Sequence, residues 1–390
     1  MTIREKAKHV SNQLIENGFT TYFAGGCVRD QLLGLEPNDY DIATSATPDQ
    51  VLDLFPNSDM VGKHFGVVIV KYLNEVFEVA TFRTDGCYND NRRPDNVTFS
   101  TPEEDAKRRD FTINAMFQNP NTDEIIDFVG GKVDIENKLI RCVGNPKKIF
   151  EEDALRIMRL FRFDAQLAHL EFAMERDTLQ SAVELKGNLR DISKERIGQE
   201  IIKILKSKNP ICITTLYSNN IINHNHNHNH NNLIHLLPYN DEVVEDVVPR
   251  LRNLCMTVDH MTKLRLPSTV IKKVVKLDEF INDFKHNIFA PFNFNNLSKF
   301  RKYYGHKLVD SALSTGDPIL VSLTEDIDNF KRMFYLFGVD ILPKPIINGQ
   351  ILIDMGLTPN KEFKNILDNI YDIQLESISP TLEELKSKVK

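Results

Sequence analysis

The sequence lacks the segments that direct a chain to a membrane or out of the cell. It has no uninterrupted apolar run of about 18 residues, the length that a membrane-spanning helix needs. The first 16 residues mix charged and polar side chains, including Glu5, and resemble neither a signal peptide nor a transit peptide. Five cysteines are scattered without a Cys-x-x-Cys pair, which is typical of free thiols in a reducing compartment. We therefore expect a cytoplasmic protein without a membrane partner.

The chain also lacks an excess of positive charge. Its net charge is −7, whereas nucleic-acid-binding proteins usually carry a basic surface. RNA binding would therefore have to depend on local clusters of lysine and arginine, each of which taken alone is more simply explained as a solvated surface. These clusters are Arg92-Arg93, Lys107 to Arg109, Lys147-Lys148, Lys272-Lys273, and Lys299 with Arg301-Lys302.

The 390 residues are enough for roughly two to four structural units. Within residues 20–140, short β-rich runs alternate with helical segments, which predicts a mixed unit with a small, partly antiparallel sheet. Two of the predicted strands, 67–72 and 76–83, are joined by residues 73–75 as a hairpin. After Pro146 most runs have helical periodicity. The pattern predicts an α+β fold in which an all-helical part follows the mixed unit.

Residues 223–232 alternate histidine with asparagine. Alternating histidines could bind a metal ion. A solvated polar tract cannot build a rigid site, however, and nothing nearby in the sequence supplies a fixed partner. We therefore interpret the tract as a repeat expansion in a surface loop, without a role.

A glycine turn follows the first predicted strand. Residues 25–30 read Gly-Gly-Cys-Val-Arg-Asp and lead into a helix predicted over 28–33. Gly25 and Gly26 allow the backbone to approach an anion, and the free N–H groups at the start of the helix can bind phosphate. Arg29 can add a fixed positive charge. The segment is not a Walker A loop, because no Gly-Lys-Ser/Thr follows it.

Two aspartates lie at the next predicted strand, 40–43. Residues i and i+2 of a strand point to one side, so the carboxylates of Asp39 and Asp41 are expected to face one place. They would repel each other unless a cation lay between them, and hard oxygen ligands beside a phosphate substrate indicate Mg²⁺. Two metal ions about 4 Å apart would stabilise the attacking and leaving oxygens of an in-line phosphoryl transfer.

A third catalytic carboxylate could come from an adjacent strand. Glu78 lies within an apolar predicted strand, where a charge is costly unless it is paired or bound to metal. The alternative is an edge-strand glutamate that faces water, and the sequence does not decide between the two.

A second polar segment, residues 107–115, places cations, an acid and an amide ahead of an apolar run. Arg109 could hold the triphosphate of a nucleotide. Asp110 and Asn114 are four residues apart and would share one helical face, from which they could orient the sugar or the arginines. A capping role for Asp110 is the alternative.

A third segment carries a polar stripe on an otherwise apolar helix. Its members recur every three residues: Asp153, Arg156, Arg159 and Arg162. An aspartate accepts hydrogen bonds and an arginine donates them, so the first two complement the amino group and ring nitrogen of cytosine and adenine. Guanine and uracil present the opposite pattern and would be rejected. The last two remain for phosphates, and salt bridges within the stripe are the alternative.

These three segments together resemble the class II tRNA nucleotidyltransferases (CCA-adding enzymes), a family that also contains bacterial poly(A) polymerases. The resemblance is strongest over residues 20–165 and continues more weakly at 192–197 and 345–360. It implies a polymerase β-like nucleotidyltransferase head, followed by an all-helical neck, body and tail. The corresponding boundaries are 1–145 for the head, 146–208 for the neck, 209–330 for the body and 331–390 for the tail.

The resemblance also implies roles for single residues. Asp39 and Asp41 would bind Mg²⁺, and Arg29 with Gly26 would contact the nucleotide, which is CTP or ATP. Asp153 and Arg156 would template the incoming base. The helical half would grip the acceptor arm of tRNA. The sequence leaves the oligomeric state open.

Three activities compete within this family: complete CCA addition, partial addition (CC only or A only) and poly(A) synthesis. Residues 84–98 resemble the flexible loop with which complete CCA-adding members switch from C to A, and residues 60–66 and the C-terminal tail also resemble those members. They favour complete addition. A non-catalytic RNA-binding protein is opposed by the intact Asp39 and Asp41 pair. A small-molecule nucleotidyltransferase would not need so long a helical appendage.

Overall fold

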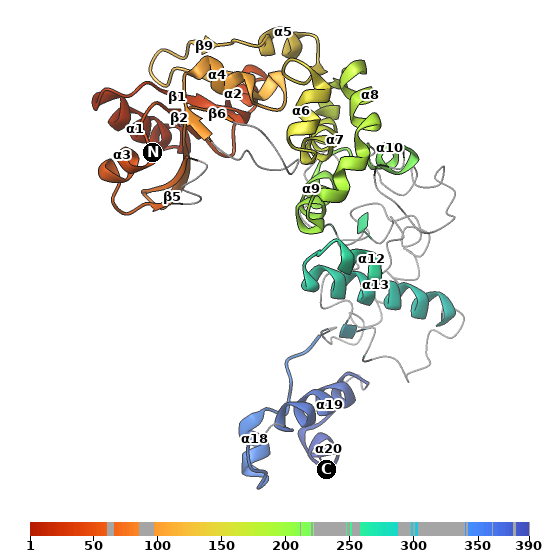
Figure 1. Ribbon diagram of the computed structural model, residues 1–390. Coiled ribbons are helices and arrows are strands. Elements are labelled where there is room, and N and C mark those ends of the chain that lie inside the picture. The colour runs from red at the N-terminus through yellow and green to blue at the C-terminus, as the bar shows by residue number, and fades with distance from the viewer. Residues whose placement is uncertain are drawn as a thin grey trace. The chain divides into compact units, whose positions relative to one another are not determined.

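The computed structural model describes most of the first half of the chain and parts of the second. The chain divides into two compact units, Met1–Asn227 and His228–Lys390 (Figure 1). The His/Asn tract and most of residues 60–66 and 84–98 lie outside the described residues. Those described are 1–60, 66–85, 97–210, 212–219, 221, 247, 250–251, 258–287, 298, 301–302, 340, 342–360, 362–376 and 380–389.

A seven-stranded sheet forms the centre of the first unit. Its strands lie in the order β3-β4-β5-β2-β1-β8-β9. β2 and β5 pair in parallel, and the other neighbours pair antiparallel, so the predicted partly antiparallel sheet is confirmed. The strands are β1 (Thr21–Ala24), β2 (Asp41–Thr44), β3 (Asp59–Met60), β4 (Val67–Tyr72), β5 (Glu75–Thr81), β8 (Phe117–Gln118) and β9 (Ile125–Ile126). A separate ribbon pairs β6 (Arg83–Asp85) with β7 (Val97–Phe99).

β4 and β5 form the predicted hairpin, but its turn is shorter than expected. Tyr72 pairs with Glu75, which leaves two residues, Leu73 and Asn74, in the turn. Both have positive φ angles, 47° and 63°. Two-residue turns of this kind match the right-handed twist of the flanking strands, and asparagine tolerates the conformation well.

Helices pack on both faces of the sheet. α1 (Ile3–Glu16) and α3 (Pro48–Leu54) share a hydrophobic core with Phe23 and Phe77. Each of these helices begins at a threonine that forms a capping box. α4 (Pro102–Lys107) packs through Ala106 against Ala43 and Phe117 in a second cluster.

The alternation of side chains along β2 decides where the polar residues lie. Ile42 belongs to the core under α1 and α3, whereas Ala43 belongs to the cluster under α4. Because residues i and i+2 of a strand share a face, Asp41 lies on the α4 side. The turn from β1 into α2 (Gly26–Leu32) lies beside it, because Ala24 pairs with Asp41.

A helical segment completes the first unit, as the sequence predicted, with one exception. Residues 173–174 form a short strand, β11 (Ala173–Met174), parallel to β10 (Leu139–Ile140). Two backbone hydrogen bonds, from the N–H of Ala173 to Lys138 and from that of Glu175 to Ile140, hold it there, and sequence periodicity does not encode such a long-range pairing. The helices are α5 (Gly131–Glu136), α6 (Pro146–Glu152), α7 (Leu155–Leu167), α8 (Arg176–Glu184), α9 (Lys194–Lys206) and α10 (Cys212–Ser218).

The second unit is helical wherever the structure describes an element of secondary structure. A small core near the C-terminus joins Ile347, Leu352, Ile370 and Leu385. The described helices are α12 (Val258–Lys263), α13 (Ser268–Asn287), α18 (Gly349–Asp354), α19 (Phe363–Leu375) and α20 (Leu382–Lys386). None of the helices among the described residues is long and apolar enough to cross a membrane.

Candidate active site

Two carboxylates, Asp41 and Glu78, lie side by side on the sheet face that carries α4, and Asp39 is near enough for its charge to act on Asp41. Asp41 is the first residue of β2, and the pairing of Ile42 with Val79 places it next to Glu78 of β5. Burial, followed by the charges of Glu78 and Asp39, raises the pKa of Asp41 to about 6, although the residue stays accessible to solvent. The predicted strand 40–43 begins one residue late, so Asp39 precedes β2 and is not placed by strand alternation.

The structure meets only part of the water-facing alternative for Glu78, because the side chain is exposed but its strand is not at the edge of the sheet. β5 pairs with β4 on one side and with β2 on the other, so Glu78 is not on an edge strand. Its side chain is exposed, and its charge acts on Asp41. No ion pair of Glu78 occurs among the described residues, and an exposed glutamate beside a like charge stays a candidate for the third carboxylate.

The donor chemistry of these side chains fits a divalent cation. Burial, followed by the like charges of Glu78 and Asp39, raises the pKa of Asp41 to about 6, and a cation would offset the repulsion between these charges. Among the described residues, no three His, Cys, Asp or Glu side chains form a ready metal cage. Mg²⁺ commonly takes one or two carboxylates and completes its shell with water and substrate phosphates. Asp39 and Asp41 are therefore the residues that could hold it.

The predicted glycine turn lies directly beside the carboxylates. Gly25 has φ 77° and ψ −130°, a conformation that favours glycine. A Cβ atom at this position would lie 3.5 Å from Nη1 of Arg109 and 3.7 Å from Oδ2 of Asp41. The structure thus brings together an open backbone turn, a guanidinium and a carboxylate, which come from two separate motifs of the sequence.

Arg29 is buried and turned toward the protein. Its Nε and Nη2 donate to Oδ1 of Asp30 (2.8 and 2.6 Å), and its Nη1 donates to Oδ1 of Asn114 (2.8 Å). The guanidinium also lies 5.5 Å from the ring centroid of Phe163. The Nδ2 group of Asn114 is buried and has no hydrogen-bond partner in the described part of the chain. One amide donor beside the glycine turn is therefore left for another molecule.

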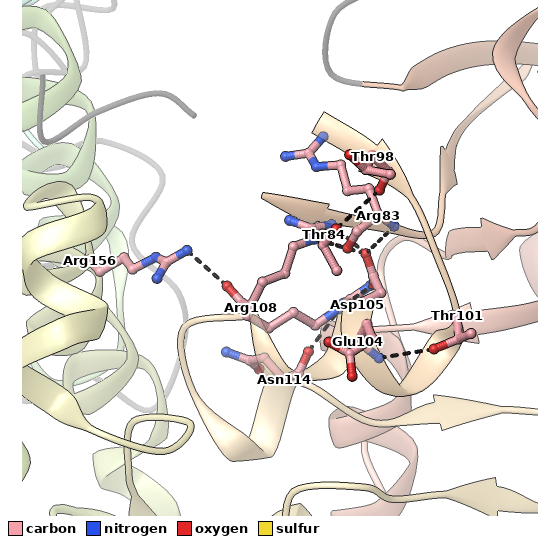
Figure 2. A network of polar contacts seen from close by, with 10 residues as sticks. Arg83, Thr84, Thr98, Thr101, Glu104, Asp105, Arg108, Asn114 and Arg156 are labelled. Atoms are coloured by element: carbon pink, nitrogen blue, oxygen red, sulfur yellow. Dashed lines mark hydrogen bonds and ion pairs between the residues drawn. The ribbon is translucent and has the colours of Figure 1, made fainter. Parts of the chain in front are cut away.

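Asp105 holds the two arginines that follow it. Its side chain is 2% exposed. Oδ2 accepts from Nε and Nη2 of Arg109 (3.1 and 3.0 Å), and Oδ1 accepts from Nε and Nη2 of Arg108 (3.0 and 2.5 Å). Figure 2 shows this carboxylate at the centre of the polar network, with Arg83 and Arg108 around it. Burial alone would raise the pKa of Asp105, but the guanidiniums of Arg109 and Arg108 overcome it and hold the pKa below the ordinary value.

Asp110 and Asn114 do not share a helical face. Phe111 is extended (φ −126°, ψ 144°), and residues 112–114 form a single 3₁₀ turn, so the expected α-helix is absent. Asp110 instead accepts from Nε of Arg159 (2.6 Å) and from the backbone N–H of Phe111 (2.8 Å). The backbone of the segment forms β-type contacts with Arg141 and Cys142. These contacts use backbone groups that a helix would need for its own hydrogen bonds.

The two side chains predicted to read the base have separate partners. Asp153 lies between α6 and α7, where Oδ1 accepts from the N–H of Leu155 and Oδ2 from Nη2 of Arg196 (3.0 and 3.2 Å). Arg156 donates through Nη1 to Glu152 (3.0 Å), and through Nη2 to the carbonyl oxygen of Arg108 (2.9 Å), a contact that Figure 2 shows. The salt bridges of this stripe therefore run to residues outside it, to Glu152 four positions before Arg156 and to Arg196 of α9.

Arg159 and Arg162 lie on α7 with one aromatic ring between them. Their guanidiniums are 5.6 and 4.3 Å from the ring centroid of Phe163. Arg162 also forms a buried ion pair with Glu200 of α9 (3.3 Å). Burial, together with the like charge of Arg159, lowers the pKa of Arg162. With Arg29 on the same ring, three positive charges gather where α2 meets α7.

Sequence reasoning missed Asp105. A signal was present, because the residue precedes Arg108 by three positions and Arg109 by four, the spacings at which helical side chains pair. It also missed Glu152, which precedes Arg156 by four positions. It missed Arg196 and Glu200 for a different reason, because their contacts with Asp153 and Arg162 depend on how α9 packs against the preceding helices.

Comparisons with known proteins agree with this architecture. Residues 21–141 match the family model of the "Poly A polymerase head domain", and residues 171–224 match that of the "Probable RNA and SrmB- binding site of polymerase A". A CCA-adding enzyme of Bacillus pumilus is 49% identical over 200 residues, which are 51% of this chain and 49% of that protein. One of Oceanobacillus iheyensis is 44% identical over 205 residues, 52% of this chain and 50% of that protein. The matched region thus spans about half the length of these curated relatives.

Solved structures match over nearly the full length. The Bacillus stearothermophilus CCA-adding enzyme in complex with CTP superimposes with a TM-score of 0.69 and 26% identity, covering 100% of this chain and 98% of that one. The Thermotoga maritima CCA-adding enzyme complexed with tRNA_CCA gives 0.61 at 23% identity and covers 98% and 93%, which supports the fold. The first part of the chain is thus similar to the poly(A) polymerase head domain, and the chain has the fold of solved CCA-adding enzymes, so the predicted fold class is confirmed.

Proposed function

We propose that this chain builds the 3′-terminal CCA of tRNA from CTP and ATP, without a nucleic-acid template. The observation that carries the proposal is the meeting of Gly25, Asp41 and Arg109 at one point of the head. An open backbone turn, a guanidinium and a carboxylate that forms no ion pair within the described residues suit a nucleoside triphosphate with its divalent cation. The likeness to CCA-adding enzymes, one of them solved with CTP, supports the same substrate.

The cation in the proposal is Mg²⁺, held by Asp39 and Asp41, with Glu78 close enough to contribute. When bound, it offsets negative charge on the attacking 3′-oxygen and on the leaving pyrophosphate. The remaining steps fall to the protein. Arg109 directs positive charge toward the phosphates, and the backbone at Gly25 and Gly26 allows them to approach. The 3′-hydroxyl of tRNA attacks the α-phosphate of the nucleotide, and pyrophosphate leaves.

Base selection falls to Asp153 and Arg156 in this proposal. The amino group of cytosine or adenine would replace Arg196 as a donor to Asp153, and Arg156 would donate to the ring nitrogen. Both side chains are already bonded, so a base must exchange for existing hydrogen bonds. A base that offers the opposite pattern would leave a buried donor or acceptor unpaired, which costs about 1–3 kcal/mol.

The helical segment after the head, with the family's RNA-binding region at 171–224, would hold the tRNA acceptor arm. A tRNA substrate is consistent with a cytoplasmic location, as is the presence of three buried free thiols, Cys27, Cys142 and Cys212.

A primer-extension assay tests the proposal. The purified protein is given tRNA transcripts that end before CCA, after C and after CC, with Mg²⁺ and each nucleotide alone, and then with CTP and ATP together. The expected result is addition of C, C and A that stops there. A protein with Asp39→Ala and Asp41→Ala serves as the inactive control.

Other outcomes assign a different function. Addition that stalls at CC, or that starts only from CC, indicates a partial enzyme. A long A tail indicates poly(A) synthesis, the activity after which the matched head domain is described. A protein that binds tRNA and incorporates no nucleotide is a non-catalytic RNA-binding protein.

A further inference from the structure

We propose that Asp105 is a positioning residue: it holds the guanidinium of Arg109 toward the nucleotide phosphates and prevents it from pairing with Asp41. The inference rests on the proposed function, because it names how one side chain of that site is kept in place. Asp105 would touch neither the substrate nor the metal ion. It would act entirely through its hydrogen bonds to Arg109.

The geometry of the clamp leaves one edge of Arg109 facing the site. Asp105 accepts from Nε and Nη2, which form the edge of the guanidinium away from the glycine turn. Nη1 lies on the opposite edge, where it donates to the carbonyl oxygen of Asn114 (3.3 Å) and lies closest to the space beside Gly25. A guanidinium has five N–H donors in a fixed plane, so donors remain on the exposed edge when the other edge is bonded.

Two further contacts restrict movement of the clamp. The guanidinium of Arg109 stacks near the ring of Phe117, with 5.0 Å from Cζ to the ring centroid. The carboxylate plane of Asp105 is fixed from its other side, because Oδ1 also accepts from Arg108 and from the backbone N–H of Arg83 (3.3 Å). Both oxygens of a carboxylate that is 2% exposed are therefore in use.

The alternative position of Arg109 would harm the site. Asp41 carries the nearest competing negative charge, and Arg109 already acts on it electrostatically. Without the charge of Asp105, pairing with Asp41 would satisfy the arginine. It would also place a fixed cation where the divalent ion is expected, and withdraw the donors from the phosphates. Asp105 therefore keeps the positive charge of Arg109 from pairing with the negative charge of Asp41.

The test is a double-mutant cycle between Asp105→Asn and Arg109→Gln, read as KM for CTP on a tRNA that ends before CCA. Asparagine keeps the shape of aspartate but removes its charge, and its amide must point a donor at one of the two guanidiniums. Asp105→Asn alone should raise KM for CTP on the order of tenfold and raise the Mg²⁺ concentration needed for half-maximal rate. In the Arg109→Gln background the same change should alter KM by less than about twofold, because its target is gone.

Asp134→Asn is the matched control. Asp134 is a buried aspartate of the same unit that, in the described part of the chain, accepts from Thr112 (2.6 Å) and Arg141 (3.1 Å) and not from Arg109. It should lose stability without an increase in KM or in the Mg²⁺ requirement. If Asp105→Asn does not fold, Asp105→Glu retains the charge one methylene away and should give an intermediate KM.

The outcomes separate this inference from the proposed function. Incorporation by the wild-type protein tests the function by itself. If that protein is active and Asp105→Asn leaves KM unchanged, or raises it equally with and without Arg109, the positioning role is wrong. If the wild-type protein incorporates nothing, the proposed function fails, and the cycle is then measured as the dissociation constant of CTP with Mg²⁺.

Discussion

Asp41 and Asp105 lie on either side of the same arginine, yet their surroundings act on them in opposite ways. The pKa of Asp41 is raised to about 6, because burial and two neighbouring carboxylates disfavour its charge. The pKa of Asp105 is lowered, because two guanidiniums outweigh an even deeper burial. The charge of Asp105 is balanced by protein groups, whereas that of Asp41 would be balanced only by a bound cation. Burial alone therefore does not distinguish a structural carboxylate from one that awaits a cation.

The largest expected effect comes from removing the charge of Asp41. Asp41→Asn takes away a proposed metal ligand, and metal stabilisation of the transition state is worth several kcal/mol. We expect a loss of nucleotide incorporation of about a thousandfold, since each 1.4 kcal/mol is about a factor of ten in rate. Primer extension under single-turnover conditions measures it. A variant with more than about a tenth of the wild-type rate would remove Asp41 from the site.

The next largest effect is on stability and concerns Asp105. Asp105→Asn removes the buried charge to which two partly buried guanidiniums are bonded, which costs about 3 kcal/mol by the standard of buried ion pairs. The midpoint of thermal unfolding should fall by several degrees. Calorimetry of the metal-free protein checks this. An unchanged midpoint would mean that Arg108 and Arg109 find other partners at no cost.

The pH dependence of metal binding should follow Asp41. A carboxylate must lose its proton to bind a cation, so affinity should be constant well above pH 6 and fall with each unit below it, up to about tenfold per unit. Electron paramagnetic resonance of Mn²⁺ measures this without catalysis. In Asp105→Asn the midpoint of the profile should move below pH 6, because the released Arg109 would pair with Asp41 and favour its charged form. A midpoint near pH 4 in the wild-type protein would show that Asp41 is not the titrating ligand.

The smallest expected effect is on stability. Asp41→Asn, which should abolish most activity, should stabilise the metal-free protein. The folded-state pKa of Asp41 lies above its unfolded value, so the group favours folding most at low pH and loses this contribution as pH rises toward 6 and beyond. Removing the charge should raise the unfolding midpoint slightly at pH 7 and leave it unchanged near pH 4. The opposite sign holds for Asp105, whose contribution is lost as pH falls. A destabilised Asp41→Asn at pH 7 would mean that the repulsion does not act on folding.

Patterns within short stretches of the sequence were enough to predict the order of the two parts of the chain and the place of the candidate site. The alternation of strands and helices before Pro146 and the helical periodicity after it predicted the order of the two parts. Glycines in the turn at residues 25–26, and the aspartates at 39 and 41, indicated a phosphate and metal site, because each signal depends on neighbours within a few residues. The similarity of these motifs to one family led to the fold that the solved structures support.

Only the tertiary structure decided which partner each charge has. Asp110 meets Arg159 across 49 positions, Arg29 meets Asn114 across 85, and Arg156 reaches the backbone of Arg108 across 48. The helix expected over Asp110 to Asn114 gave way to extended backbone and one 3₁₀ turn, because pairing with residues near 141 satisfies its backbone. Spacing along the chain encodes which face a side chain takes. The choice among several possible ion-pair partners is made when distant segments pack and exclude water, and burial then gives each charge its cost or its role.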